Sequence, residues 1–393
     1  MSTNEHVATQ TLSSSAPQKG KVASDKKDKK RKAASTKAPS SARTTQAGSK
    51  KPRPAKKIVH PCPVQPMDMD ISCTTVPFPD TERWKSKLGA DGYVVLTGVL
   101  TPAEGQQLRD EWATALRLIN PALDMSDPTT LTKKNLPGIA SVGIFKDPAC
   151  GIGHSRLMYL TRQKLTKVFA AFYATKELQT SFDGASLFPD WSHPELKSSK
   201  TKPAWIHTDQ ESSEFRCVQG MCQLLETTPA TGGFVVVPGS HLVHATVRAT
   251  TTRKGNYLPV DYGHPDIIGI MQERGLALVT APANSVVLWD SRVLHSNHPA
   301  LTPIPAAPEA GLALLRLNQY VTMTPRRTDA ATLAARLEMV DKHLLGNHWT
   351  YRDGKRGPMK AEHLAYPRHR SFNALGSAAL PVEEIRSQYS EML

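Results

Sequence analysis

Short β-like segments separated by turn residues fill the middle of the 393-residue chain and restrict the folds it can adopt. Each segment is rich in apolar residues, and most have Gly, Pro, Asn or Ser at or beside one end. They cover residues 215–225, 234–237, 276–279, 285–295 and 312–322. Helix-like apolar spacing precedes them around residues 101–116 and 161–178, and follows them from Thr328. The sequence therefore predicts a mainly β fold with flanking helices, either a β-sandwich or an open barrel.

The first of these helices has a clear start signal. Thr101 is a good N-cap residue, Pro102 suits the first turn, and Glu104 completes a capping box. Apolar residues then recur at helical spacing, at Leu108 and Trp112. The pattern predicts a core-facing helix without a chemical role.

Charge divides the chain unevenly. Residues 1–60 carry 15 Lys and Arg against three acidic residues, whereas the remainder carries 34 basic and 32 acidic residues. The tail has almost no large apolar side chains, so it is predicted to be disordered. We expect a disordered basic tail at 1–60, a linker at 61–79, the main domain at 80–327, and a helical C-terminal extension at 328–393.

Two lysine-rich clusters in the tail, at 26–32 and 50–57, suggest nuclear import or weak nucleic-acid contact. A nuclear or cytoplasmic location is expected, with the tail favouring the nucleus. Five scattered cysteines with no Cys-x-x-Cys pattern argue against a disulfide framework or a zinc site. No apolar run approaches the length of a membrane span, so no membrane association is expected.

The clearest chemical signal is His207-Thr208-Asp209. Side chains at positions i and i+2 of a strand leave the same face, so the imidazole of His207 and the carboxylate of Asp209 would converge. The same spacing occurs at His193-Pro194-Glu195, but Pro194 favours an edge or a turn. A second, distant histidine would complete the facial triad typical of non-haem Fe(II) oxygenases.

His295 supplies that second histidine, and Arg316 supplies a site for an anion. His295 ends the apolar segment 285–295, and lies 88 residues after His207. Arg316 lies inside the apolar segment 312–322, and a buried guanidinium needs an anion, best a carboxylate. The residues thus suggest a metal held by His207, Asp209 and His295, with a carboxylate-bearing co-substrate on Arg316.

With these pieces in place, the sequence resembles the phytanoyl-CoA dioxygenase family of Fe(II)- and 2-oxoglutarate-dependent oxygenases. The resemblance covers roughly residues 80–330 and keeps the order of the motifs. The matching segments are 92–95, 205–210, 218–220, 232–241, 288–295 and Arg316. It implies a double-stranded β-helix, or jelly roll, whose ligands converge at one mouth.

The resemblance also implies roles for individual residues. His207, Asp209 and His295 match the iron ligands, Arg316 matches the arginine that pairs with 2-oxoglutarate, and Asn297 is a further candidate for contact with this co-substrate. Arg316 follows His295 by 21 residues, a long spacing that the Pro-rich insert 299–310 explains. Arg292 is the alternative arginine. The implied reaction uses O2 to hydroxylate a small-molecule substrate and releases succinate and CO2.

Two other readings remain open at this stage. A nuclear hydroxylase acting on a chromatin protein or nucleic acid would use the basic tail, although the near-neutral remainder argues against a large basic groove. The second alternative is a non-catalytic jelly-roll binding protein whose basic tail contacts nucleic acid. The intact set of three candidate metal ligands argues against this alternative.

Overall fold

The computed structural model of the protein describes residues 61–351 and 376–393, apart from a few short internal gaps. The gaps are residues 66–67, 72–73, 133, 137–142, 146–149, 204, 305–311 and 347. The predicted disordered tail at 1–60, with its proposed import and nucleic-acid roles, lies outside the described residues. Among the helices that are described, none is long and apolar enough to cross a membrane.

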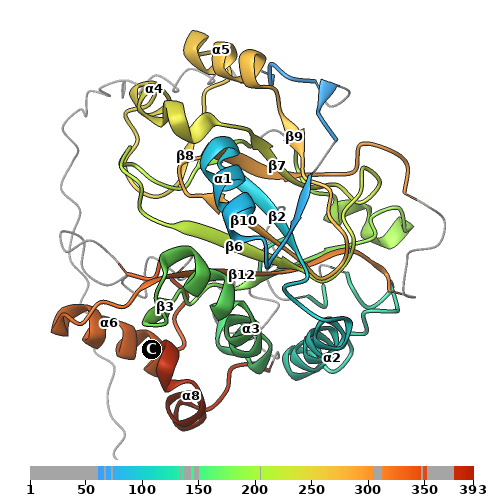
Figure 1. Ribbon diagram of the computed structural model, residues 1–393. Helices are drawn as coiled ribbons and strands as arrows, with labels where there is room; N and C mark the ends of the chain where they lie inside the picture. The colour runs from blue at the N-terminus through green and yellow to red at the C-terminus, as the bar shows by residue number, and fades with distance from the viewer. Residues whose placement is uncertain are drawn as a thin grey trace, which may run out of the picture. The chain divides into compact units, whose positions relative to one another are not determined.

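Two sheets form the jelly roll (Figure 1). One sheet has seven strands in the order β1-β2-β10-β6-β12-β3, with β4 also paired to β12, and the other has five in the order β8-β5-β11-β7-β9. The strands are β1 (Thr75–Pro77), β2 (Tyr93–Thr97), β3 (Leu178–Thr180), β4 (Ala185–Pro189), β5 (His207–Thr208), β6 (Val218–Gln223), β7 (Gly233–Val237), β8 (Leu258–Pro259), β9 (Ala277–Leu278), β10 (Ser285–Asp290), β11 (Leu294–His298) and β12 (Leu314–Pro325).

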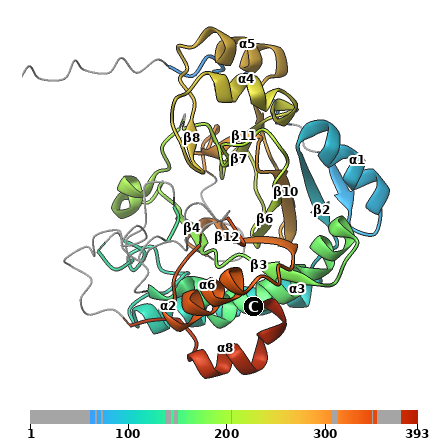
Figure 2. The ribbon, with the colours of Figure 1, turned by 90° about the vertical axis from the view of Figure 1, so that its left-hand side faces the viewer.

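Helices cover the outer faces of both sheets. Figure 2 shows α2, α3, α6 and α8 on the side of the seven-stranded sheet, with α4 and α5 beside the five-stranded sheet. The α-helices are α1 (Thr81–Asp91), α2 (Pro102–Ile119), α3 (Arg156–Tyr173), α4 (His244–Ala249), α5 (Pro265–Arg274), α6 (Ala330–Asp341) and α8 (Val382–Gln388). The 3-10 helices are η3 (Ile152–His154), η4 (Pro194–Ser199), η5 (Ser240–Val243) and η8 (Ser390–Met392).

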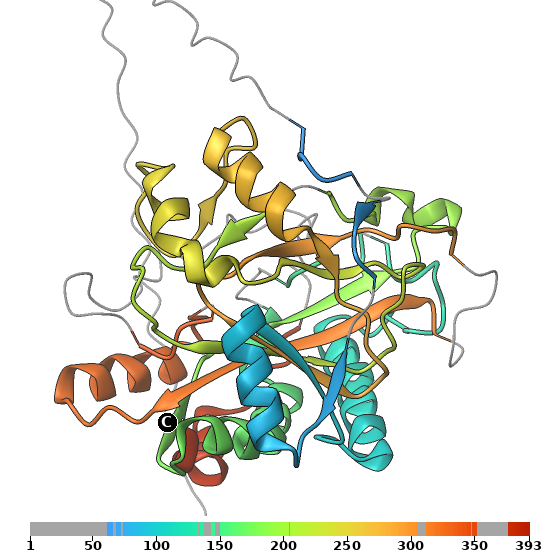
Figure 3. The same cartoon turned by 45° about the horizontal axis from the view of Figure 1, so that its top comes forward.

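Local sequence signals explain the N-terminal part of this arrangement. The predicted capping box is present in α2, because the Thr101 side chain accepts from the Glu104 amide while the Glu104 carboxylate accepts from the Thr101 amide. β1 pairs in parallel with β2 at the edge of the larger sheet, next to α1 (Figure 3). Gly92 ends α1 in the left-handed conformation that glycine adopts most easily.

Strand alternation divides the apolar side chains between separate cores. On β10, Val286 and Leu288 join the core under the helices, whereas Val287 and Trp289 face the interior between the sheets. Val236 on β7 faces the same interior from the opposite sheet. The candidate site residues lie on these inward faces, so packing of the two sheets determines the site.

The prediction of one continuous strand at 285–295 was wrong. β10 ends at Asp290 in the seven-stranded sheet, and β11 begins at Leu294 in the five-stranded sheet. A turn in which the Val293 amide donates to the Asp290 carbonyl (2.9 Å) joins them. Trp289 and His295 therefore do not share a strand face, but their rings still meet from opposite sheets, with centroids 5.7 Å apart.

Candidate metal centre

Two histidines face each other across neighbouring strands of the five-stranded sheet. His207 on β5 pairs in register with His295 on β11, and residues opposite each other in an antiparallel pair point to the same face. Their neighbours Ile206 and Leu294 pack outward, in the core with α4 and α5. Both imidazoles therefore point into the interior, with ring centroids 4.4 Å apart.

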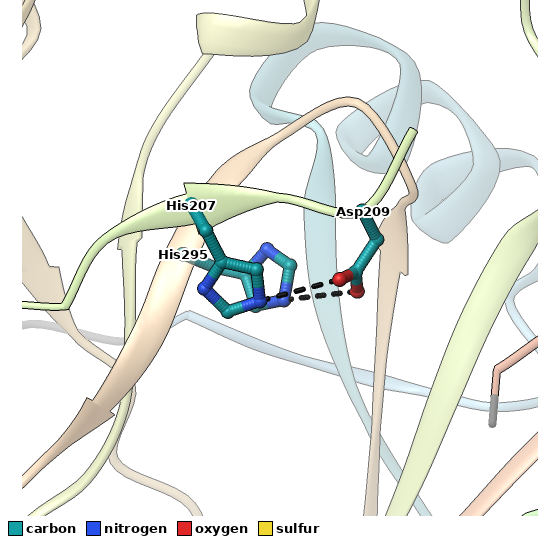
Figure 4. Close-up of side chains that lie close together, drawn as sticks. All are labelled: His207, Asp209 and His295. Atoms are coloured by element: carbon teal, nitrogen blue, oxygen red, sulfur yellow. Dashed lines mark ion pairs between the residues drawn. The ribbon is translucent and has the colours of Figure 1, made fainter. Parts of the chain in front are cut away.

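Asp209 completes the cluster from the residue just beyond β5. Its amide donates to the Ser291 carbonyl (3.2 Å), and the Thr208 hydroxyl donates to the same carbonyl (3.2 Å). Its carboxylate faces the Nε2 edges of both rings, with Oδ1 3.2 Å from His207 Nε2 and Oδ2 3.3 Å from His295 Nε2 (Figure 4). All three predicted ligands thus come together, and all three are buried.

The hydrogen bonds of the two rings leave their inner nitrogens free for a metal. His207 Nδ1 donates to the Trp205 carbonyl (3.2 Å) and His295 Nδ1 to the Val293 carbonyl (3.0 Å). In a neutral ring with the proton on Nδ1, Nε2 is an acceptor with a lone pair. Here that lone pair points at the Asp209 carboxylate, which is also an acceptor. Asp209 Oδ2 is buried and accepts no hydrogen bond. Acceptors that converge in this way fit a cation between them.

Burial and neighbouring charges shift the pKa values of two of the three residues, His207 and Asp209. Burial lowers the pKa of His207, so its ring is neutral at pH 7. Burial alone would raise the pKa of Asp209, but the charge and hydrogen bonds that the two imidazoles supply when protonated hold it well below its usual range. The three ligand atoms lie within 4.8 Å of one another and are the one such group of His, Cys, Asp or Glu found in the described residues. Two imidazoles and one carboxylate match the donor set of a non-haem Fe(II) site.

Aromatic rings enclose the cluster. Trp205 stacks on His207 at 5.1 Å between centroids, and Tyr257 lies 4.6 Å from the same ring. Phe234 packs on His295 at 5.4 Å. Low-polarity walls of this kind limit water around a metal and strengthen its electrostatic interactions.

Arg316 is buried next to the cluster without an anionic partner among the described residues. Its side chain is 1% exposed, its guanidinium carbon lies 3.6 Å from the centre of the Phe188 ring, and its Nε has no hydrogen-bond partner. Burial lowers its pKa to about 9, which still leaves it charged at pH 7. A register shift between β12 and β4 lies next to it, a type of irregularity that often redirects a side chain.

Asn297 connects Arg316 to the strand that carries His295. The Arg316 Nη1 donates to Asn297 Oδ1 (3.1 Å), and Nη2 donates to the Thr201 hydroxyl (3.2 Å). Arg292, the alternative arginine, is already paired with Asp290 through Nε (2.9 Å) and Nη2 (2.7 Å). The geometry favours Arg316 as the anion-binding residue.

Other histidines with similar sequence patterns do not join the cluster. His193 precedes η4 rather than lying in a strand. The same spacing occurs a third time at His264-Pro265-Asp266, but these side chains are exposed at the start of α5. Near the cluster, sequence reasoning missed Thr201 and His348, because both lie in loops with no periodic pattern.

Comparison with known proteins gives relatives that align with more than half of the chain. The Ava biosynthesis cluster protein O of Aspergillus versicolor is 26% identical over 258 residues, covering 62% of this chain and 78% of that protein. The ectoine dioxygenase of Sphingopyxis alaskensis is 26% identical over 236 residues, covering 58% and 74%.

Solved structures that align with the chain include EctD from S. alaskensis with 2-oxoglutarate and 5-hydroxyectoine, at 16% identity and a TM-score of 0.39, covering 70% of this chain and 86% of that one. The non-heme alpha ketoglutarate dependent epimerase SnoN aligns at 17% identity and a TM-score of 0.41, covering 63% and 83%.

The family model described as "Phytanoyl-CoA dioxygenase (PhyH)" matches residues 88–306, which is more than half of the chain. This range includes the three clustered ligands. The chain belongs to the phytanoyl-CoA dioxygenase family and is an Fe(II)- and 2-oxoglutarate-dependent dioxygenase.

Proposed function

We propose that His207, Asp209 and His295 bind Fe(II), and that Arg316 binds the carboxylate of 2-oxoglutarate that lies farther from the metal. The observation that carries the assignment is the convergence of three acceptors, among them the unpaired Asp209 Oδ2, on one point. When bound, the iron supplies oxidation of a substrate C–H bond by O2, coupled to conversion of 2-oxoglutarate to succinate and CO2.

The protein's own residues orient the ligands and the co-substrate. The carbonyls of Trp205 and Val293 hold the two rings so that each Nε2 is presented inward. The guanidinium of Arg316 is held by Asn297 and stacks on Phe188, so it is positioned before a carboxylate arrives. Three protein ligands would leave further coordination positions on the metal for the co-substrate and O2.

The substrate is a small molecule. Relatives that share this region include ectoine dioxygenases and a protein of a biosynthesis cluster, which supports a small metabolite over a protein or nucleic-acid substrate.

The first test is anaerobic titration of Fe(II) and 2-oxoglutarate, monitored by the visible charge-transfer band of the chelate. Wild type should develop the band, His207→Ala should lose it, and Arg316→Ala should need more 2-oxoglutarate to reach it. His264→Ala is the matched control, since His264 has the same spacing to an aspartate but lies at the surface. A folded wild-type protein without the band would refute the site.

We further propose that the basic tail, residues 1–60, directs nuclear import and takes no part in catalysis. Its 15 basic residues within residues 1–60 support this role. A fluorescent fusion of residues 1–60 should accumulate in nuclei, and substitution of the cluster at 26–32 should abolish that. Deletion of residues 1–60 should leave 2-oxoglutarate turnover unchanged. If the deletion instead removes turnover, the tail contributes to the reaction.

A further inference from the structure

His348 comes from the C-terminal extension, outside the family match at 88–306, yet it lies next to the metal cluster. Its ring packs edge-on against Trp289 at 6.4 Å between centroids and against Tyr320 at 5.5 Å. Trp289 in turn packs on His295 at 5.7 Å. One aromatic ring therefore separates His348 from a metal ligand.

Contacts on both sides hold this part of the extension in place. The Gly346 amide donates to the Phe182 carbonyl (3.0 Å), and the Thr350 hydroxyl shares a 2.6 Å hydrogen bond with Thr324 on β12. Buried Arg336 donates to the Thr350 carbonyl (2.6 Å). These bonds fix the loop that carries His348 against β12 and the segment at Phe182.

Asp183 determines which edge of the His348 ring is available. Its Oδ2 lies 2.5 Å from His348 Nδ1, while its Oδ1 accepts from the Gly184 amide (2.9 Å). Burial alone would lower the pKa of His348, but the charge and hydrogen bond of Asp183 raise it to about 9, so the ring is protonated at pH 7. With Nδ1 engaged, Nε2–H on the far edge is the remaining donor, and no described residue accepts from it. The side chain is 24% exposed.

Two further polar groups on the same inner face lack partners. Gln219 on β6 pairs in register with Trp289 on β10. The amide oxygen and nitrogen of Gln219 have no hydrogen-bond partner, and the indole Nε1 of Trp289 has none either. Both residues are buried, with Gln219 0% and Trp289 2% exposed. Buried polar atoms are rarely left unpaired, so a polar ligand is expected beside them.

We propose that His348, oriented by Asp183, is a substrate-binding residue whose Nε2–H donates to a carboxylate or carbonyl oxygen of the substrate, with Gln219 and Trp289 beside it. The proposal rests on the proposed function, since it names a feature of the substrate for that site. A charge-assisted hydrogen bond is a strong determinant of specificity, because an analogue without the oxygen cannot form it.

The test uses full-length protein loaded with Zn(II) and saturating 2-oxoglutarate, because the zinc complex does not react with O2. The 15N-labelled histidine side chains are followed by NMR. The probes are butyrate and butyramide, which carry acceptor oxygens, and butylammonium, which does not. The His348 Nε2 signal should shift in a saturable way with both acceptors and not with butylammonium. The variant His348→Phe keeps the ring volume and should bind both acceptors at least about tenfold more weakly, equivalent to about 1.4 kcal/mol.

Conservative variants separate binding from packing. His348→Gln retains a side-chain N–H and should recover part of the affinity, whereas a purely structural role predicts no recovery. Acceptor binding unchanged in His348→Phe, or no saturable shift with either acceptor, would overturn the proposal. Both variants should still form the Fe(II)–2-oxoglutarate band, since His348 is not a ligand. Loss of that band in wild type would mean failure of the proposed function instead.

Discussion

His207 and His295 lie opposite each other in register on β5 and β11, and each ring donates Nδ1–H to the backbone carbonyl two residues before it. The same local bond thus orients both imidazoles, and their inner nitrogens meet the same carboxylate. Because the bonds are made by the backbone, the orientation of each ring depends on strand geometry rather than on other side chains.

Metal binding should stabilise the folded protein. Fe(II) added anaerobically at about 100 times its dissociation constant contributes about 2.7 kcal/mol. For a domain of about 300 residues that corresponds to an increase in Tm of roughly 4 °C. Differential scanning fluorimetry should show the increase in wild type and in His264→Ala, and a chelator should reverse it. An equal increase in Asp209→Ala would place the metal elsewhere.

Asn297→Ala should weaken 2-oxoglutarate binding without affecting the metal. The substitution removes the acceptor that holds Arg316 Nη1, so the guanidinium is no longer oriented before binding. We expect the Kd for 2-oxoglutarate to rise about tenfold, within the range for a hydrogen bond to a charged group, while the Kd for Fe(II) alone stays the same. Asn318→Ala is the control, because Asn318 bonds to Ser186. Matching effects of the two variants would contradict the assigned role.

His154 should make the fold sensitive to acid. It is fully buried between the Tyr159 hydroxyl and the Leu344 carbonyl, and burial lowers its pKa to about 3. The unfolded chain binds a proton near pH 6.5 and the folded chain does not, so stability is lost as pH falls from about 6.5 toward 3, by about 1.4 kcal/mol per unit. Urea unfolding at pH 7 and pH 5 should show a smaller loss in His154→Gln. Direct titration by NMR gives a second check, and a pKa near 6.5 in the folded protein would disprove the prediction.

Alanine substitutions at Gly92 and Gly98 should distinguish the cost of backbone strain from the cost of steric overlap. Both have positive φ, 77° and 72°, but a Cβ on Gly92 would lie 2.4 Å from His241 Nδ1, while a Cβ on Gly98 would meet nothing within 4 Å. Gly98→Ala should cost about 1 kcal/mol through φ alone. Gly92→Ala should cost at least about 1 kcal/mol more, because the His241 ring must also move. Chemical denaturation of both variants measures the difference, and equal losses would show that the ring gives way freely.

Local pattern was sufficient for much of the architecture and for two residues of the clustered site, His207 and Asp209. The capping box at Thr101 and the spacing of His207 and Asp209 depend on residues within a few positions of each other, so they can be recognised in sequence. His295 and Arg316 were identified from their places in apolar segments, and the family resemblance, which carries long-range information, supported both assignments. The segment 285–295 was misjudged, because an apolar run shows no sign of where a chain passes from one sheet to another.

The sequence by itself determined the mainly β composition, the charged tail, and the residue types of the cluster, since these depend on local propensity and short spacing. Tertiary structure alone decided that Asn297 meets Arg316 and that Asp183 meets His348, residues 19 and 165 positions apart. The packing of the two sheets sets those contacts. Burial then decides their chemistry, because loss of water and proximity of charge set the pKa of a group, and neither can be read from its neighbours in sequence.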